Sequence, residues 1–96
     1  VGDFDRAIAD FTTLVAQDAT DVTALNGRGS SYARQQRFDK AIADFDAALK
    51  VDPRNPMTLV NRGSVYSDLR QFDKSVQDFT AAIAVDPLRG HTYNSR

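Results

Sequence analysis

The chain has 96 residues, enough for one domain at most, and a chain of this size buries only about 60 to 65% of the surface that its unfolded form exposes. Hydrophobic residues make up 42% and charged residues 26%, which is ordinary for a globular protein and excludes a disordered tail or a fibrous chain. The formal charge of -1 excludes a strongly basic surface for nucleic acid, and the lack of cysteine excludes disulfides and thiolate chemistry.

No apolar run reaches the roughly 20 residues that a membrane-spanning helix needs. Residues 1–5 also lack the basic and apolar regions of a signal peptide. We therefore expect a soluble chain with no membrane partner, and the composition leaves its compartment open.

The sequence repeats itself with a period of 34 residues. Residues 22–55 align with 56–89, and 15 of the 34 positions are identical. The same shift places 1–21 over 35–55, and residues 90–96 begin another copy. A period of this length predicts one domain in which each copy is a supersecondary unit, with two full copies flanked by two partial ones.

Each full copy is expected to hold two helices. The second helix of the first full copy carries apolar residues at three- and four-residue steps along one face: Phe38, Ala41, Ile42, Phe45, Ala48 and Leu49. The first helix carries a thinner stripe, formed by Leu25, Gly29 and Tyr32. Both stripes recur in the next copy, so the sequence predicts an all-α solenoid of antiparallel helix pairs.

Two repeated glycines, Gly29 and Gly63, lie within predicted helices. Glycine in a helix costs about 1 kcal/mol relative to alanine, so its recurrence predicts a close approach between two helices. We expect the small residues Ala41 and Ser75 to be the surfaces that these glycines meet.

The helix ends also have local signals. Asp21 and Asn55 are predicted to cap helix N-termini, and Pro56 suits the first position of a helix because its missing N–H would be unpaired there. Asp52 precedes Pro53, which disfavours helical geometry at the aspartate and predicts the end of the second helix.

These spaced residues resemble the tetratricopeptide repeat. They are Leu25, Gly29, Tyr32, Phe38, Ala41, Phe45, Ala48 and Pro53 in one copy, and Leu59, Gly63, Tyr66, Phe72, Phe79, Ala82 and Pro87 in the next. The Asn-Arg-Gly triplet at 61–63 is similar to a common bacterial form. The resemblance implies an α-solenoid of about two and a half repeats that binds other proteins, in a bacterial cytoplasm or periplasm. Gln36 and Arg70 depart from the family, which usually has glycine there.

The sequence holds little material for catalysis or metal binding. His91 is the only histidine, whereas a metal site needs three or four ligands. Solvated positions or helix starts are the simpler interpretation for five recurring carboxylates: Asp5, Asp10, Asp39, Asp44 and Asp78. We predict no enzyme activity and no cofactor.

A series of arginines occupies a position that is usually apolar in the family: Arg28, Arg62 and Arg96. It recurs together with one series of aspartates: Asp10, Asp44 and Asp78. The favoured interpretation is a set of scaffold ion pairs, in which each aspartate binds an arginine on another helix or the basic residue four positions earlier on its own helix. The alternative is that the arginines project into a groove and bind acidic groups of a ligand.

The resemblance implies a concave groove lined by the first helix of each unit. The candidate groove residues are Asn26, Ser30, Arg34, Val60, Asn61, Ser64, Asp68, His91 and Asn94, and the same face carries Thr23, Gly27 and Met57. Most of these side chains are small and polar, which predicts hydrogen bonding with modest affinity. Basic residues outnumber acidic ones nearby, which favours a mildly acidic ligand.

Family members that bind the carboxylate tails of heat-shock chaperones use lysine and asparagine on one helix, asparagine on the next, and lysine and arginine on the third. The matching positions here hold Asn26 with Ser30, then Asn61, then His91 with Ser95. Only Asn61 agrees, so we do not expect chaperone-tail binding.

Three classes of function remain. The favoured one is a protein–protein interaction module that binds a peptide or partner helix in the concave groove. The alternative is a self-assembly scaffold, a homo-oligomer that forms through helix ends and convex faces, because partial copies leave apolar faces uncovered. Helical-repeat RNA binding is the third class, and the net charge argues against it.

Overall fold

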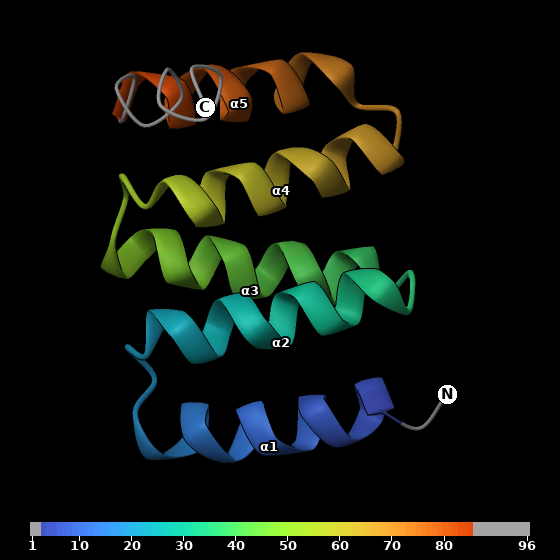
Figure 1. Cartoon of the computed structure of the whole chain (residues 1–96), viewed down its shortest axis with the longest axis vertical. Coiled ribbons are helices and arrows are strands. Elements are labelled where there is room, and N and C mark those ends of the chain that lie inside the picture. The colour runs from blue at the N-terminus through green and yellow to red at the C-terminus, as the bar shows by residue number, and fades with distance from the viewer. Residues whose placement is uncertain (1–2, 86–96) are drawn as a thin grey trace, which may run out of the picture.

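The computed structural model describes residues 3–85, which form five α-helices and no strand. The helices are α1 (Asp3–Gln17), α2 (Val22–Arg34), α3 (Phe38–Val51), α4 (Pro56–Asp68) and α5 (Phe72–Val85). They run back and forth in a stack that begins with α1 and ends with α5 (Figure 1). The predicted all-α solenoid of antiparallel helix pairs is confirmed.

The helices pack most closely in hairpins, α2 with α3 and α4 with α5. α3 joins the two hairpins by packing on α4, α2 also contacts α4, and α1 covers α2. None of the described helices has the length and apolar character needed to span a membrane.

Side chains cap two helices as the sequence predicts. Asp21 Oδ1 accepts a hydrogen bond from the backbone N–H of Ala24 at 3.0 Å, and Asn55 Oδ1 accepts one from the N–H of Thr58 at 3.0 Å. These bonds satisfy donors that a helix N-terminus leaves unpaired. α3 ends at Val51, immediately before Asp52.

The C-termini of α2 and α4 end in the same left-handed turn. Gln36 and Arg70 both have φ of 61°, and the N–H of each bonds to the carbonyl of the third residue before it, at 2.9 and 3.0 Å. The following N–H groups, of Arg37 and Gln71, bond five residues back at 2.9 and 2.8 Å. This is the Schellman arrangement, and it explains why the family usually has glycine at these two positions.

The two repeated glycines, Gly29 and Gly63, lie against aromatic rings. A Cβ on Gly29 would lie 2.6 Å from the ring of Phe45, which is 1% exposed, and a Cβ on Gly63 would lie 3.1 Å from the ring of Phe79. The predicted close approach is confirmed. The atoms nearest to the glycines include the rings of Phe45 and Phe79, one turn further along α3 and α5 than the expected Ala41 and Ser75.

Candidate functional site

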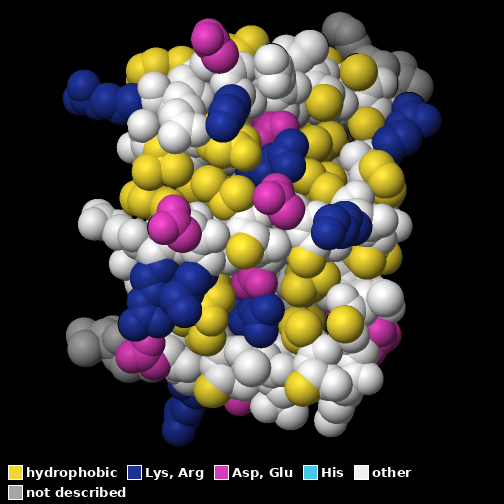
Figure 2. All heavy atoms as spheres, turned by 180° about the vertical axis from the view of Figure 1, so that it is seen from behind, with side chains coloured by type: hydrophobic (Ala, Val, Ile, Leu, Met, Phe, Trp, Pro, Cys, Tyr) yellow, Lys and Arg dark blue, Asp and Glu magenta, His cyan; other side chains and the backbone are white. Residues whose placement is uncertain are grey.

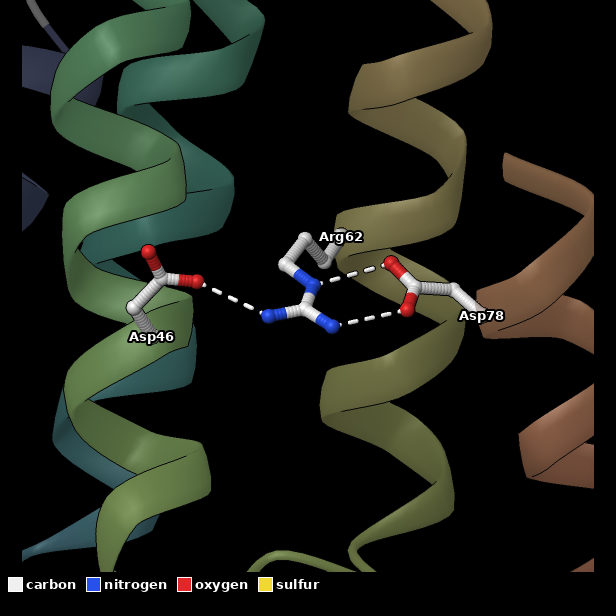
Figure 3. Close-up of polar contacts among 3 residues, drawn as sticks. All are labelled: Asp46, Arg62 and Asp78. Atoms are coloured by element: carbon white, nitrogen blue, oxygen red, sulfur yellow. Dashed lines mark hydrogen bonds and ion pairs between the residues drawn. The ribbon is translucent and has the colours of Figure 1, made fainter. Parts of the chain in front are cut away.

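Two aspartates hold two arginines through paired hydrogen bonds. Arg28 on α2 donates from Nε and Nη2 to the carboxylate of Asp44 at 2.8 and 2.7 Å. Arg62 on α4 donates in the same way to Asp78 at 2.9 and 2.8 Å (Figure 3). The Asp44 and Asp78 side chains are only 8% and 7% exposed, so the expectation that they are solvated was wrong. The bidentate guanidinium offsets the cost of taking each carboxylate out of water.

The remaining nitrogen of each arginine reaches the preceding helix pair. Arg62 Nη1 donates to Asp46 Oδ1 on α3 at 2.9 Å, so this guanidinium joins α3, α4 and α5 (Figure 3). Arg28 Nη1 donates to the hydroxyl of Thr12 on α1 at 3.4 Å. In both arginines, the hydrogen bonds to the paired aspartate raise the guanidinium pKa, which keeps the group protonated.

Asp10, the first member of the aspartate series, is exposed and forms no ion pair with any other described residue. Each bound arginine lies 16 residues before its aspartate, and no position of this sequence has that offset from Asp10. Arg96 lies outside the described residues.

Figure 2 shows one broad face of the stack, where Lys or Arg side chains contact Asp side chains down the middle and hydrophobic side chains lie beside them. Both signs of charge are interspersed on this face. It therefore lacks the single-sign field that attracts a phosphate backbone.

A hollow with a volume of about 510 Å³ opens between α1, α2 and α4. Three of the predicted groove residues line it together: Asn26, Ser30 and Asn61. Thr23 and Met57, from the same predicted face, line it too. Two consecutive first helices thus contribute side chains to one concave site, as the repeat geometry requires.

The other predicted groove residues do not line the hollow. Four of them are exposed elsewhere along α2 and α4: Arg34, Val60, Ser64 and Asp68. The guanidinium of Arg34 instead lies 5.9 Å from the centroid of the Phe4 ring on α1. His91 and Asn94 lie outside the described residues.

Asn26 is more buried than a ligand-binding side chain is expected to be, at 6% exposure. Its Oδ1 accepts a hydrogen bond of 2.8 Å from the hydroxyl of Thr58, which is fully buried on α4. This bond links α2 and α4, two of the three helices that line the hollow. Among the hydrogen bonds of the described residues none uses the Asn26 amide nitrogen, so it is free to donate at the hollow surface.

Sequence reasoning missed four lining residues: Phe11, Val22, Asn55 and Pro56. Phe11 is the most informative, because a Cβ on Gly27 would overlap its ring. Gly27 is aligned with Asn61 of the next copy, so the 34-residue alignment shows that position 27 lacks the side chain that its equivalent carries. Only the packing shows that an aromatic ring from α1 fills the place beside it.

Two models of the tetratricopeptide-repeat family match the sequence, one over residues 1–56 and the other over 29–94. The chain belongs to the tetratricopeptide-repeat family. A comparison with curated proteins finds no match. The tetratricopeptide-repeat chain is similar to a solved structure described as the second such domain of Spaghetti (RPAP3) bound to the HSP90 peptide SRMEEVD, with a TM-score of 0.83 and 24% identity. That alignment covers 88% of this chain and 79% of the other, and it shows that the fold is shared.

Proposed function

We propose that this tetratricopeptide-repeat domain is a protein-interaction module that binds a peptide segment in the hollow between α1, α2 and α4. The observation that carries the proposal is the hollow itself, about 510 Å³ in volume and lined by three helices. Its size falls within the roughly 300 to 1,000 Å³ that is usual for ligand pockets. The domain with which it shares its fold was solved with a peptide bound, which supports the same class of partner here.

Repeats of this family serve protein interaction, and we propose no catalytic role for the domain. Among the described residues, no three histidine, cysteine, aspartate or glutamate side chains gather in a way that could hold a metal ion. The two buried aspartates are each bound to a guanidinium, so neither is available as a general base in the hollow.

A peptide-display selection against the whole 96-residue chain, followed by an NMR titration with the selected peptides, tests this function. We expect the side-chain amide signals of Asn26 and Asn61 to shift on binding, because both line the hollow. Asn61→Ala should weaken binding about tenfold, the loss expected when a bound polar group is left unpaired. Asp68→Ala, an exposed change on the same helix outside the hollow, serves as the matched control.

The proposal fails if no peptide is enriched, or if the enriched peptides bind Asn61→Ala as tightly as the unaltered chain.

A scaffold that assembles through helix ends is the second candidate function, and the exposed apolar face of α5 favours it. Phe72, Val76 and Ile83 are 57%, 60% and 63% exposed.

A further inference from the structure

We infer that the hollow selects an extended peptide by an uncharged apolar side chain, of the size of leucine, methionine or phenylalanine, and discriminates against acidic side chains. This inference rests on the proposed function, because it assumes that a peptide binds in the hollow. It differs from the mildly acidic ligand that the sequence favours.

Among the described residues, no charged side chain lines the hollow. The two described members of the arginine series do not supply a cation there, because Arg28 and Arg62 are bound to carboxylates on other helices. An acidic side chain seated here would lose water without gaining an ionic partner, which is strongly unfavourable. The exposed Arg34, which contributes to the basic excess of the concave face, lies outside the lining.

Apolar groups form part of the wall. The ring of Phe11 lies against Gly27, and Val22, Pro56 and Met57 also line the hollow. Met57 is 59% exposed, so an apolar side chain seated beside it would remove part of its surface from water. Methionine also adapts its shape to an irregular partner, which suits a site that accepts several apolar residues.

The polar groups of the hollow are suited to a peptide backbone. Within the described part of the chain, no hydrogen bond uses the amide nitrogen of Asn26 or the side-chain amide of Asn61. An extended strand exposes one N–H and one C=O at each residue, and both require partners when the strand is buried. An asparagine amide has both a donor and an acceptor, so Asn61 can pair with the two backbone groups of one peptide residue.

Pools of blocked heptapeptides with one fixed central residue and random flanks provide a direct test. The immobilised 96-residue chain is exposed to each pool, and the retained peptide is quantified. We expect the leucine, methionine and phenylalanine pools to be retained at least fivefold more than the aspartate and glutamate pools, since an apolar side chain gains burial and a carboxylate loses hydration.

Two variants that introduce a charge distinguish binding in the hollow from nonspecific binding elsewhere on the surface. Met57→Glu should abolish retention of the apolar pools, whereas Val51→Glu, an equally drastic change at a 45% exposed residue outside the hollow, should leave it intact. Met57→Leu should retain the preference. Both positions are exposed, so thermal melting by circular dichroism is expected to show that the variants stay folded.

The remaining outcomes distinguish the two proposals. If acidic or basic pools are retained as well as the apolar ones, and Asn61→Ala abolishes that retention, the groove function stands and the apolar selectivity is overturned. If no pool is retained above a blank surface, the proposed function fails together with the inference. The free peptide SRMEEVD, which the RPAP3 domain binds, should bind this chain no better than the aspartate pool.

Discussion

At the residue scale, Arg28 and Arg62 bind their paired aspartates in the same way, but the Nη1 atom of each arginine donates to a different kind of acceptor. Arg62 reaches the carboxylate of Asp46, and Arg28 reaches the hydroxyl of Thr12 at the equivalent place one repeat earlier. A carboxylate accepts a charge-assisted hydrogen bond, whereas a neutral hydroxyl at 3.4 Å is a weak partner. The guanidinium of Arg62 therefore holds α4 to α3 more strongly than the guanidinium of Arg28 holds α2 to α1.

Thr12→Asp should strengthen this contact by placing a carboxylate beside Arg28. We expect the free energy of unfolding to rise by about 0.5 kcal/mol, the usual size of an exposed ion pair. Threonine and aspartate have similar helix propensities, so the change isolates the charge. Urea denaturation monitored by circular dichroism measures the effect, and high salt should reduce it. Thr12→Asn is the neutral control, and an equal gain in that variant would refute the electrostatic explanation.

At the scale of elements, α2 and α4 end at residues that adopt a conformation unfavourable for their side chains. Gln36 and Arg70 have φ of 61°, in the left-handed region where a Cβ meets the following carbonyl oxygen. Both side chains are exposed, so little packing compensates for the strain. The hydrogen bonds of the turn use backbone N–H groups and do not depend on either side chain.

Gln36→Gly and Arg70→Gly should therefore each raise the free energy of unfolding by about 1 kcal/mol, because glycine removes the left-handed strain and keeps the backbone hydrogen bonds. Gln35→Gly is the contrasting variant: its φ is -89°, so glycine relieves no strain there. It adds chain entropy to the unfolded state and removes the hydrogen bond that Gln35 Nε2 donates to Asp5 Oδ1, so it should destabilise the domain. Thermal and urea unfolding measure all three. A loss of stability at Gln36 and Arg70 as large as that at Gln35 would contradict the assignment of strain.

At the scale of the whole molecule, the two ends of the stack differ from its middle. On α3 the apolar residues Phe38 and Ile42 are half-buried against the core that includes Val65 of α4. Their equivalents on α5, Phe72 and Val76, are 57% and 60% exposed. α1 at the other end has no buried residue among those described. Exposed apolar side chains on the end helices of the described stack are available for association.

We expect the chain to self-associate at high concentration through α5. Val76→Glu combined with Ile83→Glu should shift sedimentation equilibrium toward the monomer, because two charges would be buried in any contact through this face. Val51→Glu, at an exposed residue of α3, should leave the association unchanged. An unaltered chain that stays monomeric at millimolar concentration would contradict the prediction.

The helices, their caps and the family could all be predicted from the amino-acid sequence alone. Each of these depends on signals that are local or strictly periodic: apolar residues at helical spacing, Asp21 and Asn55 before a helix, and a period of 34 residues. The resemblance to the family predicted that Asn26 and Asn61 share one concave face, and the structure brings both to the hollow. A repeated pattern fixes such features because every copy folds under the same constraints.

The groups that fill the spaces between helices could not be predicted in this way, because they depend on the three-dimensional packing. The pairing of Asp44 with Arg28, the ring of Phe11 beside Gly27, and the exclusion of Arg34 from the hollow all depend on how far one helix lies from the next. Sequence spacing specifies the face on which a residue lies, but not the reach of a neighbouring side chain into that face. Close packing of whole side chains determines which of them occupy these spaces, and it thereby determines the apolar character of the hollow.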